Sequence, residues 1–228
     1  MSAFSILIRM PLRRAPSSVI ALVSLAGMLA TAAPGSAQVS EPIGRFVFDA
    51  HVSLTRYDQT NQVADSLNVK RVNLPTRGRG LSVGAHVYPF RWRKLTVGVG
   101  ASAVWSSGNL RPVDANKLPI GPRVETKLAA FAPQVSFNFG SGNGWSYISG
   151  GLGTAIYTMR LTAKEEPERL PRQRAIHFGA GARWFAKPHI GFSFDLRWYT
   201  LAGQEWSEQW PLVPPTTRMV VSAGVSIK

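Results

Sequence analysis

The sequence predicts an all-β fold: an eight-stranded antiparallel up-and-down transmembrane β-barrel, after an N-terminal signal peptide. Three observations predict it. Eight segments alternate apolar and polar residues, the connections between them alternate long and short, and the polar faces combine glycine with charge. Alternation with a period of two is typical of strands. In a barrel immersed in lipid, large apolar side chains face outward, and small or charged ones fill the narrow lumen.

The chain begins with a basic segment containing Arg9, Arg13 and Arg14, an apolar run at 19–33 and small residues at 35–37. This order is typical of a secretory signal peptide. We therefore expect residues 1–37 to be removed and residues 38–228 to form one outer-membrane β-barrel domain. An uncleaved inner-membrane anchor is the alternative for the same run. No later segment resembles a transmembrane helix, so a mature chain that crosses a membrane must do so as a barrel.

Alternation defines each strand in turn. The predicted strands, in chain order, are residues 45–55, 80–90, 95–105, 126–140, 145–161, 173–185, 190–199 and 217–227. The first, for example, places Phe46 and Val52 on one face and Asp49 on the other. Pro133 is a local irregularity in the fourth strand, because proline has no N–H to donate to a ladder.

The connections between these strands alternate in length. The short ones are 89–94, 141–144 and 186–189, and Ser-Gly-Asn-Gly at 141–144 is a strong hairpin signal. The long ones are 57–79, 109–123, 162–172 and 201–215. A membrane barrel with both ends in the periplasm has short periplasmic turns and long external loops in this order.

Motifs of glycine and aromatic residues recur in these strands. They are Trp-Ser-Tyr-Ile-Ser-Gly-Gly-Leu-Gly at 145–153, Gly-Ala-Gly-Ala-Arg-Trp-Phe at 179–185 and Asp-Leu-Arg-Trp-Tyr at 195–199. The chain thereby resembles the outer-membrane β-barrel domain family, the small OmpA-like and OmpX-like eight-stranded barrels of Gram-negative bacteria. The resemblance implies insertion into the bacterial outer membrane by the barrel-assembly machinery, and it says little about activity. The sequence ends Val225-Ser226-Ile227-Lys228, whereas such barrels usually end in an aromatic residue that this machinery reads.

Composition limits the partners. The chain has 26 Lys and Arg against 12 Asp and Glu, a net charge of +14. The basic residues are dispersed among strands and loops, so we expect an anionic envelope surface rather than nucleic acid as their counterpart. The sequence has no cysteine, which excludes a disulfide framework, a thiolate metal site and a thiol nucleophile.

Charged and imidazole side chains gather on the predicted inner faces. They are Asp49, His51, His86, His177, Arg183, Asp195, Arg197 and Arg218. An eight-stranded lumen is barely wide enough for side chains, so these groups must pair with one another or with water. We expect a salt-bridged plug, and a gated ion or proton path is the alternative. The three histidines lack metal-ligand spacing, no motif indicates a serine hydrolase at the rim, and no cofactor is expected.

Aromatic and basic residues outside the lumen suggest contact sites. Five tryptophans fall near predicted strand ends, where interfacial girdles lie: Trp92, Trp105, Trp145, Trp184 and Trp198. The basic residues predicted in loops include Arg77, Arg79, Arg111, Lys117 and Arg123. They are either solvated or in contact with lipopolysaccharide phosphates. Trp206 and Trp210 lie in the fourth long connection and form either a small loop core or a stacking surface.

These observations favour a structural or interaction role at the bacterial envelope, through four external loops, and not an enzyme. A narrow channel or transporter for small solutes is the first alternative. The second is a soluble periplasmic calycin-like binding barrel, whose apolar faces would line a cavity. That arrangement would place Arg183, Asp195 and Arg197 outside, in water.

Overall fold

The computed structural model describes residues 42–93, 95–162, 172–203 and 215–228. The predicted signal peptide at 1–37, together with Trp206 and Trp210, lies outside the described residues. The described residues form one compact unit. No helix in the described part of the chain is long and apolar enough to cross a membrane.

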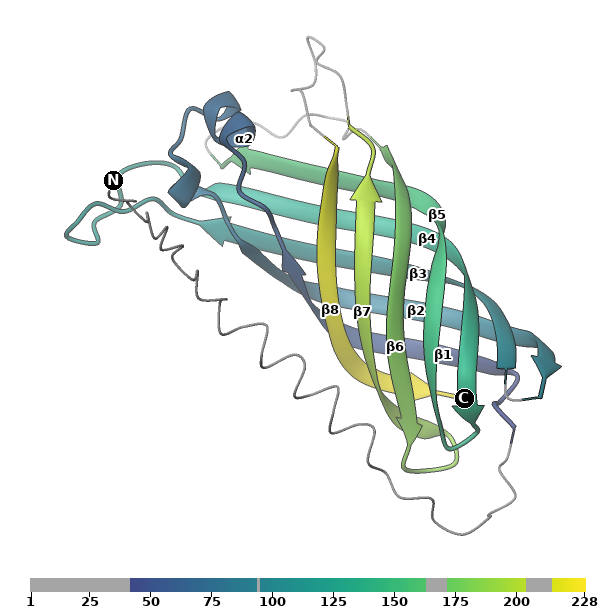
Figure 1. Ribbon diagram of the computed structural model, residues 1–228. Helices are drawn as coiled ribbons and strands as arrows, with labels where there is room; N and C mark the ends of the chain where they lie inside the picture. Colours follow the sequence, from purple (N-terminus) through teal and green to yellow (C-terminus); the bar gives the residue numbers. More distant parts are fainter. Residues whose placement is uncertain (1–41, 94, 163–171, 204–214) are drawn as a thin grey trace, which may run out of the picture. The chain divides into compact units, whose positions relative to one another are not determined.

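Eight antiparallel strands form a closed barrel in sequence order, which confirms the predicted fold class (Figure 1). They are β1 (Phe46–Arg56), β2 (Arg77–Trp92), β3 (Leu95–Leu110), β4 (Val124–Ser141), β5 (Gly144–Leu161), β6 (Gln173–Phe185), β7 (Ile190–Leu201) and β8 (Thr216–Ile227). Because β1 pairs with β2 on one side and β8 on the other, the sheet has no unpaired edge.

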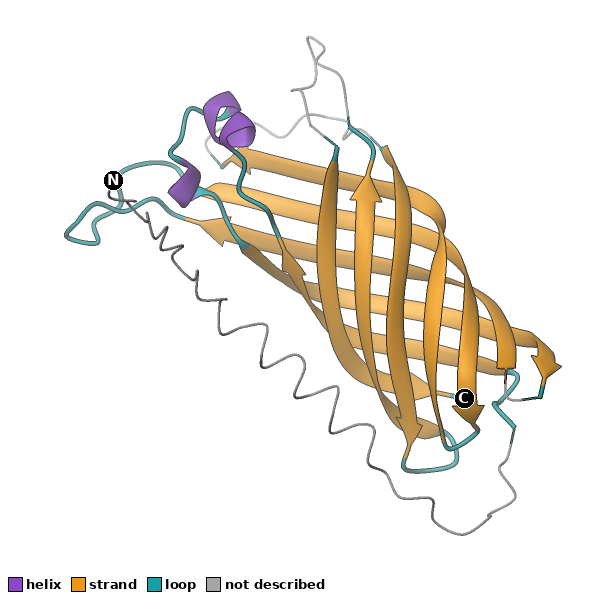
Figure 2. Ribbon diagram, in the orientation of Figure 1, coloured by secondary structure: helices purple, strands orange, loops and turns teal. Residues whose placement is uncertain are grey.

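The connections alternate in length as predicted, with short turns after β2, β4 and β6. The first long connection holds the only helical elements of the described residues, the helix α2 (Asn61–Ser66) and the 3₁₀ turn η1 (Arg71–Asn73) (Figure 2). Thr60 caps α2 by accepting a 3.3 Å hydrogen bond from the backbone N–H of Val63. Ala64 packs with Leu74 and with Val124 at the start of β4, so a small apolar cluster holds this connection against the barrel.

Most strands extend beyond their predicted bounds, and the largest extensions are in β2 and β3. β2 begins at Arg77 rather than residue 80, and β3 continues to Leu110. The prediction that Arg77 and Arg79 lie in a loop is therefore wrong. Backbone pairing continues where apolar alternation stops, because the ladder needs only N–H and C=O groups.

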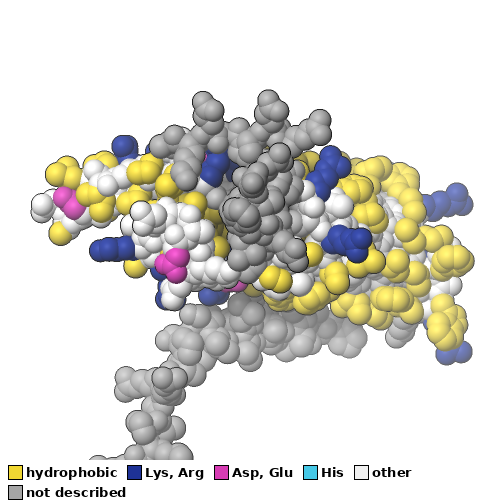
Figure 3. Space-filling model, turned by 90° about the horizontal axis from the view of Figure 1, so that it is seen from above, with side chains coloured by type: hydrophobic (Ala, Val, Ile, Leu, Met, Phe, Trp, Pro, Cys, Tyr) yellow, Lys and Arg dark blue, Asp and Glu magenta, His cyan; other side chains and the backbone are white. Residues whose placement is uncertain are grey.

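Apolar side chains cover the outer wall, and polar ones point inward. On β1, Val52 is 67% exposed, whereas its neighbours His51 and Ser53 are buried. The pattern recurs around the barrel, with exposed residues such as Leu81, Trp105, Phe131, Leu152, Ile176, Phe192 and Val225. Figure 3 shows hydrophobic side chains spread over the visible barrel wall, with basic ones at its margins. A closed apolar band of this kind is a lipid-facing surface.

The same distribution contradicts the hypothesis of a soluble calycin-like binding barrel. That reading required the apolar faces to line an internal cavity and the charged residues to face water. Instead, Arg183 is 1% exposed, and Asp195 and Arg197 are also buried inside the barrel. The protein is a transmembrane barrel with a polar interior.

Candidate functional site

Glycine makes room for the large polar side chains of the lumen. Six of these side chains stand opposite a glycine on a neighbouring strand: Asp49 opposite Gly84, His51 opposite Gly224, His86 opposite Gly100, His177 opposite Gly151, Asp195 opposite Gly181 and Arg197 opposite Gly179. A Cβ at Gly151 would lie 2.9 Å from Nε2 of His177. The alternation of glycine and charge in the sequence is therefore a packing requirement of the narrow lumen.

Asp49 on β1 and Arg183 on β6 form a buried bidentate ion pair. Nε of Arg183 donates to Oδ1 at 2.9 Å, and Nη2 donates to Oδ2 at 2.5 Å. The carboxylate also accepts a 2.5 Å hydrogen bond from the Ser226 hydroxyl. The guanidinium lies over the ring of Tyr147, 4.2 Å from its centroid. Fork geometry with additional donors is the arrangement that stabilises a buried pair.

Asp195 and Arg197 form a second pair within β7. Nε and Nη2 of Arg197 donate to the carboxylate at 3.0 and 2.9 Å. The Tyr147 hydroxyl donates to Oδ2 of Asp195 at 2.7 Å. The remaining nitrogen of Arg197, Nη1, donates to Ser102 Oγ at 2.7 Å and to Gln134 Oε1 at 2.6 Å. Both charges of this pair are thus hydrogen-bonded to partners from other strands.

Gln134 and His86 connect the two pairs. Since Gln134 Oε1 accepts from Arg197, its Nε2 is a donor, and it lies 2.6 Å from Nε2 of His86. That ring nitrogen can accept this hydrogen bond, and Nδ1 on the other side of the ring lies 3.4 Å from both Oδ2 of Asp49 and Nη2 of Arg183. His86 therefore contacts the first ion pair directly and the second through Gln134.

The contacts close into a ring that we call the lumen ring. Its members, in order, are Asp49, His86, Gln134, Arg197, Asp195, Tyr147 and Arg183. The two carboxylates of the ring, on Asp49 and Asp195, balance its two guanidinium groups, on Arg183 and Arg197. The cavity left beside these residues is about 10 Å³, near the minimum that holds one water molecule.

The other predicted lumen residues lie outside this ring. His51 Nε2 is 2.6 Å from Ser193 Oγ, and His177 Nε2 is 3.2 Å from the carbonyl oxygen of Pro133. Arg218 donates to the Tyr157 hydroxyl at 3.1 Å. Within the described ranges, no group of three or more His, Cys, Asp or Glu side chains is arranged to hold a metal ion.

Apolar and aromatic clusters fill the lumen on both sides of the ring. Toward the long connections, the cluster consists of Tyr57, Val104, Leu128, Ala130, Ala132, Ala155, Tyr157, Ala175, Tyr199, Leu201 and Val220. Toward the short turns, it consists of Ile43, Val47, Tyr88, Trp145 and Tyr147, with Phe185 packed against it. Tyr57 follows the end of β1, its hydroxyl lies 2.8 Å from Ser106 Oγ, and burial raises its pKa.

The prediction that Trp145 belongs to the interfacial aromatic girdle is wrong. It lies inside the barrel, 3% exposed, with its ring 5.1 Å from that of Phe185 and 6.1 Å from that of Tyr88. The reason is parity: Trp145 and Tyr147 are two residues apart on β5 and face the same side. The remaining predicted tryptophans lie on the outer wall: Trp92, Trp105 and Trp184 are exposed, and Trp198 is half-buried against Phe178.

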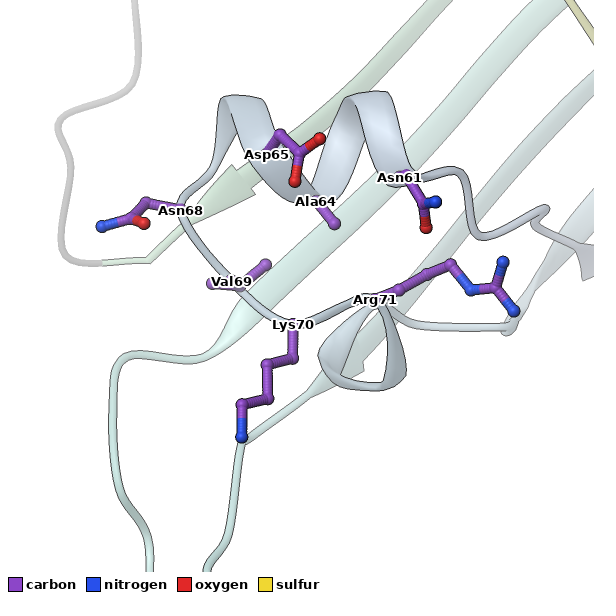
Figure 4. Close-up of a pocket in the computed structure, with 7 residues that line it drawn as sticks. All are labelled: Asn61, Ala64, Asp65, Asn68, Val69, Lys70 and Arg71. Atoms are coloured by element: carbon purple, nitrogen blue, oxygen red, sulfur yellow. The ribbon is translucent and has the colours of Figure 1, made fainter.

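The basic residues outside the lumen fall into two groups. Arg111, Lys117 and Arg123 lie exposed in the second long connection, as predicted, whereas Arg77 and Arg79 point outward from β2. The first long connection has an open hollow of about 440 Å³ next to α2. Figure 4 shows its Lys70 and Arg71 side chains pointing in different directions rather than converging, so we assign no ligand to it.

Comparisons with known proteins show similar barrels. No protein-family model matches the chain, and neither does any curated protein. Among solved structures, it is similar to Neisserial surface protein A, with 12% identity and a TM-score of 0.48 over 81% of this chain and 97% of that one. Ail, the attachment invasion locus protein of Yersinia pestis, matches with 11% identity and a TM-score of 0.47 over 81% and 98%. The outer membrane protein OprG from Pseudomonas aeruginosa matches with 10% identity and a TM-score of 0.48 over 82% and 97%. Likeness at this level does not transfer a function.

Proposed function

We propose that this protein is a bacterial outer-membrane barrel with a structural or interaction role at the cell envelope, and that it is neither an enzyme nor an open channel. The observation that carries the proposal is the filled lumen. Charges in the lumen ring balance one another, and aromatic clusters pack on both sides of it. A conducting path needs continuous space for water, and a cavity of about 10 Å³ does not provide it.

The external end supports an interaction role. The long connections lie at one end of the strands, and exposed Arg111, Lys117 and Arg123 give the second of them a positive charge. Such a surface attracts phosphate groups, so lipopolysaccharide is the first partner that we propose. In this proposal the short turns face the periplasm, and the barrel-assembly machinery inserts the protein into the outer membrane.

Two measurements on the mature chain test the proposal. Protein extracted from outer membranes should migrate faster on a cold SDS gel than after boiling, because a closed barrel resists SDS until it is heated. The same protein in planar bilayers should show no conductance steps at neutral pH. Stepwise conductance that changes in the R183A/R197A variant would overturn the structural reading in favour of a channel through the lumen ring.

A further inference from the structure

Three arginines lie together on the outer wall of β1 and β2. Arg56 and Arg77 are directly opposite each other in the strand register, and Arg79 is the next outward residue of β2, opposite Leu54 on β1 and Ser107 on β3. All three side chains are exposed. We call Arg56, Arg77 and Arg79 the wall cluster.

Opposed like charges are unfavourable in a sheet. Directly opposite residues have Cβ atoms about 4.5–5.5 Å apart, so two guanidinium groups there repel each other. Among the described residues, no acidic side chain forms an ion pair with the wall cluster. The basic residues of β4 and β5 differ, since Lys127 and Arg160 share Glu125 at 3.6 and 3.0 Å. Within the described ranges, the wall cluster therefore has no acidic partner of the kind that Glu125 provides for Lys127 and Arg160.

The position of the wall cluster indicates where a counter-ion would come from. The outward residues next to it are Leu54 and Leu81, which are 58% and 60% exposed, and Trp105 lies at the same level on β3. These residues mark the edge of the apolar band, with a tryptophan where interfacial aromatics lie. Arginine side chains one step beyond that edge reach the layer that contains lipid phosphates.

We propose that the wall cluster binds the phosphate groups of a phosphorylated glycolipid in the surrounding outer leaflet. Guanidinium forks match phosphate oxygens in pairs, and Ser107 adds a hydroxyl beside Arg79. One phosphate between Arg56 and Arg77 would turn their repulsion into a bridge. This inference rests on the proposed outer-membrane location and moves the lipid contact from the loops to the barrel wall.

Matched variants in defined bilayers test it. The wall variant is R56Q/R77Q/R79Q, and the control is R111Q/K117Q/R123Q, which removes the same charge from the second long connection. Each is reconstituted into phosphatidylcholine bilayers with and without bisphosphoryl lipid A. The measurements are the urea midpoint of unfolding and the lipid A retained in native mass spectrometry.

Lipid A should raise the unfolding midpoint of the unaltered protein and of the loop control, and much less that of the wall variant. Retention of lipid A by the wall variant should fall about tenfold or more, because the loss of even one of its three charge-assisted contacts lowers affinity by about that factor. In phosphatidylcholine alone, the wall variant should be at least as stable as the unaltered protein, which shows that it folds.

Three results would overturn the inference. Equal retention by the wall variant and the unaltered protein removes the wall site, and a loss confined to the loop control would then return the contact to the loops and preserve the proposed function. Equal stabilisation by millimolar inorganic phosphate would mean that the site takes a free anion instead of a lipid. Lower stability of the wall variant in phosphatidylcholine would mean that the arginines serve the fold itself.

Discussion

The lumen ring and the wall cluster treat charge in opposite ways. In the lumen, Asp49 balances Arg183 and Asp195 balances Arg197, and each guanidinium has further partners. On the wall, Arg56 and Arg77 face each other, and no acidic side chain in the described part of the chain pairs with them. No counter-ion from solution can easily enter a filled lumen, whereas lipid phosphates would surround the wall at the membrane location that we propose. The chain thus supplies internal charge balance where the environment cannot provide it.

The largest expected effect comes from breaking that balance in the lumen. Asp49→Asn leaves Arg183 buried without its carboxylate, and we expect a loss of about 3–5 kcal/mol in the free energy of unfolding. Urea unfolding in phosphatidylcholine vesicles measures it. In D49N/R183M, where neither charge remains, most of the loss should be recovered. A single variant within about 1 kcal/mol of the unaltered protein would mean that the pair resembles an exposed one.

The next prediction compares a tryptophan inside the barrel with one on its outer wall. Trp145→Ala removes a ring packed between Tyr88 and Phe185 inside the barrel, and a loss of about 3 kcal/mol is expected from the cavity that remains. Trp184→Ala on the outer wall should have a clearly smaller effect, because lipid chains fill the space. Urea midpoints of both variants in the same vesicles make the comparison, and equal losses would contradict the inward position of Trp145.

The alternation of residues along each strand predicts which side chains face the lumen and which face the wall, but it does not predict which lumen side chains pair with one another. Alternation separates the inner from the outer face, and it places Asp195 and Arg197 side by side on one strand. Parity with Tyr147 also predicts that Trp145 lies inside, although its place at a strand end favoured the girdle. The Asp49–Arg183 pair joins residues 134 positions apart across the lumen, so it depends on strand register and tilt. The hydrogen bond from His177 to Pro133 likewise crosses β5 at Gly151.

The wall cluster could not be predicted from the sequence either, because it also depends on strand register. Arg77 and Arg79 follow a long polar stretch, so the sequence favours a loop there, and Arg56 stands just beyond the predicted end of the first strand. Only the register that pairs Arg56 with Arg77 brings them together. The cleaved signal peptide and the roles of Trp206 and Trp210 lie outside the described residues and stay predictions.

The smallest expected effect is a change in the free energy of unfolding whose sign should differ between bilayers with and without lipid A. Arg77→Glu converts the opposed pair with Arg56 into an opposite-charge pair, which should stabilise the barrel in phosphatidylcholine by a few tenths to about 1 kcal/mol. In bilayers with lipid A, the same substitution should lower the unfolding midpoint relative to the unaltered protein, because a carboxylate repels phosphate. The opposing shifts, read from urea titrations in the two lipids, separate a lipid-compensated wall from an intrinsically stable one. A gain in both bilayers would mean that no phosphate bridges the arginines, and the chain would then tolerate their repulsion unaided.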